Sequence, residues 1–497
     1  MDYVSTRNNS VKIKAAQAIT SGIAPDGGLY TPVSFPSITM EDIASLCKMG
    51  YRERAAEILS LFLDDFTKEE LTSFVNSAYS GDKFDDPAIA PVKKLKTGEF
   101  MLELWHGPTS AFKDVALQLL PYLMTASLKK TGEKKEVCIL VATSGDTGKA
   151  ALEGFSDVSG TRIIVFYPKD GVSKIQKLQM TTQKGSNVGV CAILGNFDDA
   201  QTAVKSIFTD EEIIKFAKGK NLFFNSANSI NWGRLVPQIV YYVSAYCELA
   251  NSGEIKIGDK INFCVPTGNF GNILSAYFAM RMGLPVNRLI CASNRNRVLT
   301  DFFNSSIYNS KRGFYVTSSP SMDILISSNL ERLLYYAAGC DDKVVRELMS
   351  SLKTNGEYNV GGEISKRLDS LYSVGSCDEA QTKETIAAVF SESGYLLDTH
   401  TAVGLHVYRE YKDKTKDETK TVIASTASPF KFCKSVLEAL GEKEQGDGPE
   451  LIGKLSKVTG IKAPEPLTAL SGLKERFSMS VPKGNIKDAV LELLELK

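Results

Sequence analysis

The sequence predicts an α/β protein built on parallel β-sheets. From about residue 100 onward, short and wholly apolar segments alternate with amphipathic ones. Strands that are apolar throughout are typical of parallel sheets whose two faces are both covered by helices. The chain is also long, at 497 residues, and a rule of about 150 residues per domain leads us to expect about three domains.

The first part of the chain has a different pattern, which predicts a small helical N-terminal domain. A turn is expected at residues 24–30 (APDGGLY), where proline sets one φ angle and the glycines accept positive φ. Two helical stretches follow, at about 40–63 and 67–79. The second begins with TKEE, a capping-box pattern.

The remaining elements alternate along the chain. Strands are expected at Val137–Thr143, Arg162–Tyr167, Val188–Leu194, Leu222–Asn225, Ile261–Val265, Leu289–Ala292 and Val422–Ala424. Helices are expected at 148–156, 173–183, 198–208, 230–249 and 271–282. In such folds ligands bind where strands end and helices begin, so polar, glycine-containing junctions are the places to search.

The composition excludes several classes of protein. The chain has 58 Lys and Arg against 58 Asp and Glu, a formal net charge of zero, so it lacks the basic excess of a nucleic-acid-binding protein. Only three histidines are present, and no metal site is expected. Nine cysteines without a CxxC pair indicate reduced, structural thiols. No secretory signal or apolar run of about 18 residues is found, so we expect a cytoplasmic protein without membrane partners.

Two junctions offer candidate anion sites. Residues 266–272 (PTGNFGN) follow a strand and open a helix, where glycines and a helix N-terminus can direct backbone N–H groups at a phosphate. Residues 142–148 (ATSGDTG) place hydroxyls and N–H groups at another helix start, which suits a carboxylate. Taken alone, the first is equally a plain turn, and the second is equally a helix cap.

Two further segments indicate a functional site only when they are considered together with the candidate phosphate site. Residues 425–429 (STASP) end a strand with hydroxyls, which by itself is common. Lys113 lies in an apolar neighbourhood, where low dielectric lowers the pKa of an amine and leaves it nucleophilic. A lone lysine is usually a surface residue, but a nucleophilic amine together with a phosphate site is what pyridoxal phosphate requires.

Taken together, these segments resemble those of a known family, the threonine synthases. The resemblance spans nearly the whole chain and is densest from about 103 to 430. It rests on the blocks HGPTSAFKD (106–114), TSGDTG (143–148), QMTT (179–182), NSINW (228–232), GNFGN (268–272), SPSMDILISSNLERLL (319–334), DTHTAVG (398–404) and STASP (425–429). The N-terminal STRN and APDGGLY resemble the additional N-terminal domain of that family.

The resemblance implies a fold type II pyridoxal-phosphate enzyme, similar to tryptophan synthase β, with two parallel-sheet lobes. It implies an N-terminal domain at 1–95, a catalytic domain at 96–430 with a smaller lobe at about 140–215, and a C-terminal helical extension at 431–497. The expected cofactor is pyridoxal 5'-phosphate, and the expected assembly is a monomer or homodimer.

Site residues are carried over from the matching blocks. Lys113 would bind the cofactor covalently and act as the general base. The cofactor phosphate would be bound by Gly268, Asn269, Phe270 and Asn272, and the pyridine nitrogen by the hydroxyl of Thr426. The substrate carboxylate would be received by a loop with Thr143, Ser144, Asp146 and Thr147. Lys174 or Arg234 is the candidate cation for the substrate phosphate.

Two positions depart from the family pattern. Many relatives have histidine where this chain has Ser428, so a histidine beside the cofactor ring is expected to be absent. Some relatives have aspartate where this chain has Asn272, which a loop working through its backbone tolerates.

The implied reaction converts O-phospho-L-homoserine and water to L-threonine and phosphate, the last step of threonine biosynthesis. Three alternatives stay open. A related phospholyase would release 2-oxobutyrate instead, and the absent histidine at 428 keeps this possibility. Another fold type II enzyme is disfavoured by the N-terminal domain, and a non-catalytic binding module by the intact Lys113.

Overall fold

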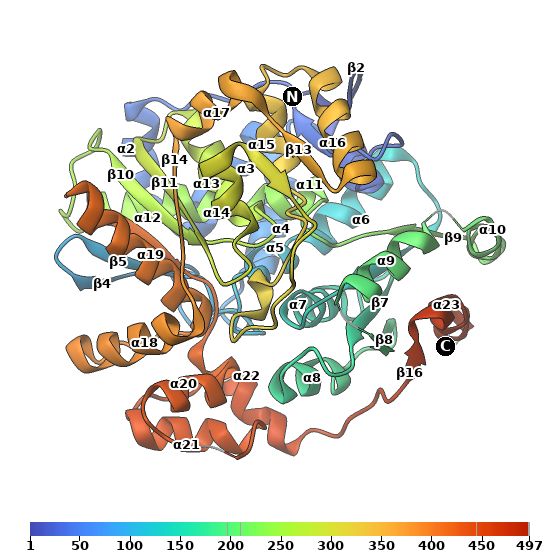
Figure 1. Cartoon of the computed structure of the whole chain (residues 1–497). Helices are drawn as coiled ribbons and strands as arrows, with labels where there is room; N and C mark the ends of the chain where they lie inside the picture. Colours follow the sequence, from blue (N-terminus) through green and yellow to red (C-terminus); the bar gives the residue numbers. More distant parts are fainter. Residues whose placement is uncertain (196, 209, 444, 496–497) are drawn as a thin grey trace.

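The computed structural model describes residues 1–195, 197–208, 210–443 and 445–495. In this part of the chain, no helix is long and apolar enough to cross a membrane. All nine cysteines are free thiols. Two largely parallel sheets with helices on their faces form the body of the molecule (Figure 1), which confirms the predicted α/β class.

The N-terminal region combines helices with a small antiparallel sheet that the sequence did not predict. The sheet has the order β2-β1-β3. The elements are β1 (Tyr3–Ser5), β2 (Asn8–Ile13), α1 (Ala15–Ser21), β3 (Tyr30–Pro32), α2 (Met40–Cys47), α3 (Tyr51–Phe62) and α4 (Lys68–Ala78).

The prediction of one helical stretch at 40–63 is wrong, because this segment forms two helices, α2 and α3. Gly50 ends the run and caps α3, and its N–H donates to the Glu53 carboxylate at 2.8 Å. The helix expected at 67–79 is confirmed as α4, and Thr67 and Glu70 form the predicted capping box.

The large sheet has the strand order β14-β11-β10-β15-β5-β4 and is parallel except for the β4–β5 pair. Its strands are β4 (Val92–Lys96), β5 (Glu99–Glu103), β10 (Ile261–Pro266), β11 (Val286–Ser293), β14 (Tyr372–Ser376) and β15 (Thr421–Ser425). Alternate residues serve its two faces, because successive strand side chains point in opposite directions.

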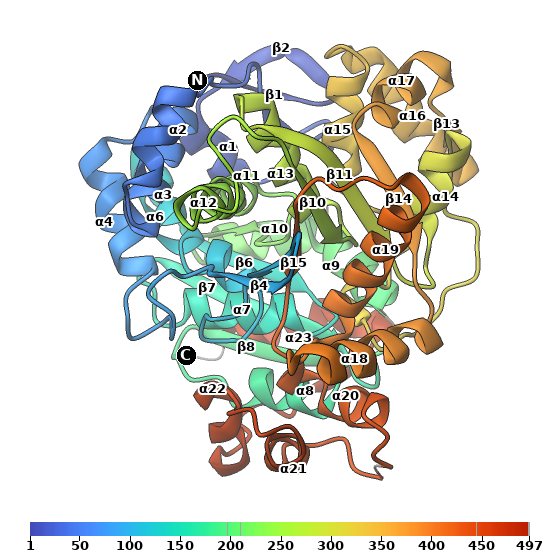
Figure 2. The ribbon, with the colours of Figure 1, turned by 90° about the vertical axis from the view of Figure 1, so that its left-hand side faces the viewer.

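One face of the large sheet, with Cys264, Ile290 and Ile423, packs under α18 (Glu379–Ser393) and α19 (Thr399–Thr415). The other face, with Phe263, Leu289 and Val422, joins the main core. That core also contains α12 (Pro237–Asn251), α13 (Gly271–Met282) and the N-terminal helices (Figure 2).

The small sheet has the order β16-β8-β7-β6-β9, and all of its pairs are parallel. Its strands are β6 (Glu136–Ala142), β7 (Thr161–Pro168), β8 (Val188–Leu194), β9 (Leu222–Asn225) and β16 (Ser480–Pro482). Helices α7 (Asp146–Phe155), α9 (Phe197–Ile207) and α23 (Ile486–Glu495) cover it.

The segment after residue 431 is more than a helical extension. Helices α20 (Cys433–Ala439), α21 (Glu450–Thr459) and α22 (Glu465–Thr468) include the residues that pack beside the large sheet's α18 and α19. An extended chain then crosses to the small sheet, where β16 adds an edge strand to β8 and α23 packs on the sheet face (Figure 1).

The other elements connect these layers. They are α5 (Lys113–Leu117), α6 (Leu120–Thr131), α8 (Lys174–Thr181), α10 (Glu211–Gly219), α11 (Trp232–Leu235), α14 (Val298–Ser305), β12 (Ile307–Asn309), α15 (Leu330–Ala337), α16 (Asp342–Asn355), β13 (Glu357–Asn359), α17 (Gly361–Asp369) and short 3-10 turns at Pro320–Met322, Pro429–Lys431, Ala469–Gly472 and Lys483–Asn485.

Candidate active site

A cavity of about 840 Å³, including its open mouth, lies between the two sheets. Strand ends from both sheets feed it, because β6 leads to Thr143, β10 to Thr267 and β15 to Thr426. All of the residues expected to bind the cofactor or the substrate carboxylate line this cavity: Lys113, Thr143, Ser144, Asp146, Thr147, Gly268, Asn269, Phe270, Asn272 and Thr426.

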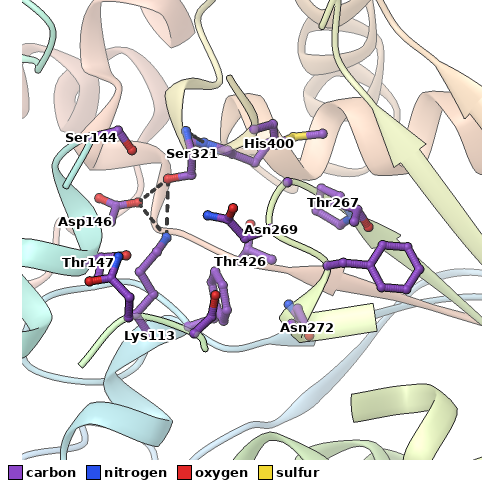
Figure 3. A pocket seen from close by; sticks show the side chains of 18 of the residues that line it. Lys113, Ser144, Asp146, Thr147, Thr267, Asn269, Asn272, Ser321, His400 and Thr426 are labelled. Atoms are coloured by element: carbon purple, nitrogen blue, oxygen red, sulfur yellow. Dashed lines mark hydrogen bonds and ion pairs between the residues drawn. The ribbon is translucent and has the colours of Figure 1, made fainter. Parts of the chain in front are cut away.

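Lys113 is the first residue of α5 and is almost wholly buried. The preceding segment is fixed by the strand end, because the Phe112 N–H donates to the Thr426 carbonyl at 2.8 Å. Asp114 fixes the same segment by accepting from the Thr109 N–H at 2.8 Å and its hydroxyl at 2.6 Å. The amine therefore leaves a rigid turn and enters the cavity (Figure 3).

The environment of Lys113 favours a neutral amine. Burial lowers the pKa of Lys113 to about 8, although the nearby Asp146 carboxylate opposes this shift. The Lys113 Nζ lies 3.5 Å from Asp146 Oδ2 and 3.3 Å from Ser321 Oγ (Figure 3). The neutral, nucleophilic fraction of the amine near neutral pH is therefore much larger than in an exposed lysine, although the protonated form still predominates at pH 7.

The loop before α13 offers several hydrogen-bond donors to an anion. In the described chain, no acceptor is paired with the backbone N–H groups of Gly268, Asn269 and Phe270. Phe270 adopts a positive φ of 63° directly before the helix, whose first N–H groups have no intrahelical partner. Ser327 binds the Gly268 carbonyl at 2.7 Å, and this contact fixes the loop from behind.

Asn272 adds one more donor. Its Oδ1 accepts from the hydroxyls of Tyr241 and Tyr242, each at 2.6 Å. Its buried Nδ2 has no partner among the described residues. Because leaving a buried donor unpaired is costly, this amide favours an acceptor bound in the cavity.

The loop after β6 is held by its own first residue. The Thr143 hydroxyl accepts from the N–H groups of Gly145 at 2.9 Å and Gly148 at 2.8 Å. The Asp146 carboxylate faces Lys113 and Lys431 rather than an anion. Ser144 and Thr147 are the loop hydroxyls left to meet a substrate (Figure 3).

Of the two candidate phosphate cations, the structure brings only Arg234 to the cavity. Lys174 is exposed and pairs with Asp447 at 2.9 Å. Arg234 is buried, binds the Ala227 carbonyl at 2.7 Å and approaches the Thr147 hydroxyl at 3.4 Å. It has no carboxylate partner among the described residues, and burial lowers its pKa to about 10.

Three families of known proteins match this chain. Residues 2–79 match the family described as threonine synthase N terminus, residues 90–427 the pyridoxal-phosphate dependent enzyme family, and residues 401–485 the threonine synthase C-terminal family. The chain belongs to the threonine synthase family.

Individual relatives agree with this assignment. Threonine synthase of Pseudomonas aeruginosa is 40% identical over 88% of this chain and 90% of its own length. The crystal structure of PLP-bound threonine synthase from Brucella melitensis is 38% identical, with a TM-score of 0.87 over 100% of both chains. Threonine synthase-like 1 of Macaca fascicularis is 39% identical over 86% of this chain, which spans only 58% of the length of that relative.

As a member of the threonine synthase family, the chain is a pyridoxal-phosphate-dependent enzyme, and its cavity fits the cofactor. The unpaired Asn272 Nδ2 and the loop N–H groups suit a phosphate, while Lys113 supplies an amine. The Thr426 hydroxyl has no partner in the described part of the protein. It is therefore free to meet a ring nitrogen.

Sequence reasoning missed several residues of this cavity. Ser321, Asn228, Ser229 and His400 line the cavity, and Lys431 lies directly behind Asp146. Four of the five stand in or beside the matched blocks, which was the available signal. Ser428 does not line the cavity, because it caps the short turn at 429–431. The histidine that does line it is His400.

His400 has a defined tautomer. Its Nε2 accepts from the Ser321 N–H at 3.2 Å, so Nδ1 carries the hydrogen and donates to Asp398 at 3.0 Å. Asp398 also caps α19, and this pairing fixes the imidazole at the wall of the cavity.

Proposed function

We propose that this chain converts O-phospho-L-homoserine and water to L-threonine and phosphate. The observation that carries the proposal is Arg234, a buried guanidinium without a carboxylate partner in the same cavity as Lys113. A buried cation of this kind favours an anionic ligand group. The cavity would then hold two phosphates, one belonging to the cofactor and one to the substrate.

The cofactor would be held by groups from three segments. Lys113 would bind it through the amine, and the N–H groups of residues 268–270 with Asn272 would bind its phosphate. The Thr426 hydroxyl would meet the ring nitrogen. When bound, pyridoxal phosphate supplies an electron sink that stabilises negative charge on the substrate carbons.

Lys113 would transfer the proton of the substrate α-carbon. Its amine has a pKa of about 8, so near neutral pH it can both accept and return a proton. It would take the proton from the α-carbon of the substrate and protonate the same carbon at the end. Asp146 and Ser321 would steady the amine from one side.

The substrate would be oriented by its two anionic ends. The Ser144 and Thr147 hydroxyls, with the start of α7, would receive the carboxylate. Arg234 would bind the γ-phosphate and stabilise its charge as it leaves. As the phosphate leaves the γ-carbon, a proton would be lost from the β-carbon. The γ-carbon would then gain a proton to become the methyl group, and water would add at the β-carbon to give threonine.

The decisive assay supplies O-phospho-L-homoserine to the purified holoenzyme and measures phosphate, threonine and 2-oxobutyrate together. We expect phosphate and threonine in equal amounts. Phosphate matched by 2-oxobutyrate would instead identify a phospholyase. No phosphate release would reject both reactions.

Arg234→Gln tests the phosphate site. We expect kcat/KM to fall by about tenfold to a hundredfold, because a charge-assisted hydrogen bond to the phosphate is worth about 1.5–3 kcal/mol. The exposed Lys174→Gln variant is the control and keeps the kinetics of the parent enzyme. Equal losses in both variants would contradict the assignment of Arg234.

A further inference from the structure

Lys431 is a buried cation behind the cavity for which the proposed reaction has no role. Its side chain is fully buried, at the end of the turn that follows β15. The Nζ lies 2.8 Å from Asp146 Oδ1 and donates to the Thr109 carbonyl at 2.8 Å. It does not line the cavity, so neither substrate nor cofactor reaches it there.

The Asp146 carboxylate divides its two oxygens between two lysines. Oδ1 faces Lys431 and accepts from Gln176 Nε2 at 2.9 Å. Oδ2 faces the cavity, where it lies 3.5 Å from Lys113 and accepts from Ser321 at 3.1 Å (Figure 3). One side of the carboxylate is thus structural, and the other meets the reacting amine.

This division matters because Lys113 cannot be a constant partner. In the proposed reaction Lys113 loses its proton and regains it. In the resting enzyme its amine would be bonded to the cofactor. If Lys113 were the sole counter-ion, each of these events would leave Asp146 buried without a cation. An unpaired buried carboxylate is strongly destabilising.

Other charged groups near this pair do not replace Lys431. Arg234 faces the cavity, but no ion pair joins it to Asp146 in the described chain. His400 and Asp114 are further titratable neighbours. The His400 Nε2 is occupied as an acceptor of the Ser321 N–H, and Asp114 is a second buried carboxyl, held by Thr109, that feels the charge of Lys431 and cannot take its place. Lys431 alone combines direct contact with Asp146 and isolation from the cavity.

We propose that Lys431 is a positioning residue, the permanent counter-ion that keeps Asp146 ionised and aligned while Lys113 gains and loses its proton. This role rests on the proposed function of Lys113, but it acts in the cofactor-bound enzyme without substrate. The positive charge of Lys431 offsets part of the attraction of Asp146 for the Lys113 ammonium. Its charge therefore keeps that nitrogen easier to deprotonate.

The test is a pH titration of the cofactor's visible absorption band in the holoenzyme. In Lys431→Met and Lys431→Gln, the full charge of Asp146 acts on the Lys113 nitrogen, and the midpoint rises by about one pH unit. Lys431→Arg keeps the charge and the parent midpoint. Lys434→Met, an exposed lysine three positions along, is the matched control.

A second background shows whether Lys431 acts through Asp146. In Asp146→Asn, the further change Lys431→Met raises the midpoint by much less than it does in the parent enzyme, because only the direct repulsion between Lys431 and Lys113 is left to remove, and this double variant contains no unpaired carboxylate at that position. It remains measurable if the single variants fail to fold. An unchanged or lowered midpoint in Lys431→Met, or a shift of equal size in the parent and Asp146→Asn backgrounds, overturns the proposal. Because no substrate is added, these outcomes are separate from any failure of the threonine assay.

Discussion

His106 illustrates how neighbours decide the properties of a single side chain. Its ring lies between two carboxylates, with Nδ1 2.5 Å from Asp85 and Nε2 3.0 Å from Glu103. Burial by itself would lower the pKa of His106, but these hydrogen bonds outweigh burial and raise the pKa to about 9. The imidazole is therefore a cation at neutral pH and links the turn before α5 to β5.

This pairing makes stability depend on pH. Since the folded pKa of about 9 exceeds the unfolded value of 6.5, the contribution is complete below pH 6.5 and is lost as the pH rises through 9. Discounting for the half-exposed Asp85, we expect a loss of about 2 kcal/mol in the free energy of unfolding across this window.

Urea unfolding at a series of pH values measures that loss. His106→Gln, which cannot titrate, is the reference and should show a flatter profile over the same range. Parallel profiles for the two proteins would show that His106 does not carry the effect.

At the scale of elements, the start of α7 depends on one glycine. Gly145 has a φ of 126°, and a Cβ there would lie 2.5 Å from the Gln176 side chain. Gln176 in turn binds Asp146 Oδ1 at 2.9 Å. A side chain at 145 would thus strain the backbone and also displace the contact that aligns Asp146.

We expect Gly145→Ala to lower kcat by about a hundredfold, because misplacing groups at the reacting centre by an ångström costs that much. Gly160→Ala is the matched control, since Gly160 also has a positive φ, of 76°, but no atom lies within 4 Å of its Cβ position. Steady-state kinetics should separate the two variants, while thermal unfolding shows a loss of stability in both, and the larger loss is in Gly145→Ala because φ 126° and ψ −74° lie outside the left-handed helical region. Equal activities would refute the role of Gln176.

Elements with a strong apolar pattern could be predicted from the sequence, and others could not. The strands β6, β7 and β10 are apolar almost throughout, and their positions are confirmed. In contrast, β4 is an edge strand of sequence VKKLK, and β5 is buried despite a glutamate at each end. Their strand character depends on pairing with each other and with β15, which a local pattern does not contain.

The same distinction holds for the candidate site. Loops 143–147 and 268–272 follow β6 and β10 directly, so the place of each at the carboxyl edge of its own sheet was predictable. Ser321 reaches Lys113 from 208 positions away in the sequence. Lys431 is recognisable only by its burial against Asp146. Such residues come together only in the tertiary structure, and their spacing in the sequence does not predict the contact.

At the scale of the whole molecule, Arg332 joins the N-terminal region to the loop at 268–272. It is fully buried and donates to the carbonyls of Tyr30 at 2.9 Å and Ile230 at 2.6 Å and to the side chain of Asn329. Asn329 holds the Asn269 carbonyl at 2.9 Å. The N-terminal sheet thus supports the loop that would bind the cofactor phosphate.

Arg332→Met should weaken pyridoxal phosphate binding by about tenfold or more, because it leaves three buried acceptors unpaired. Titration of the apoprotein with cofactor, followed by absorbance, measures the change. Arg332→Lys restores binding only in part, since an ammonium lacks the planar fork of donors. Arg367→Met, at an exposed arginine, is the control. If the Kd of Arg332→Met for the cofactor equals that of the parent, Arg332 does not support the loop.

The crossing of the chain to β16 bears on how the protein is made. The β8 edge of the small sheet stays open during synthesis until residues 480–482 have left the ribosome, although β8 itself emerges far earlier. An uncovered strand edge invites pairing with other chains. The nascent protein therefore stays prone to aggregation until late in translation. Shortening its C-terminal segment would lower the yield of soluble enzyme more than the activity of the molecules that fold.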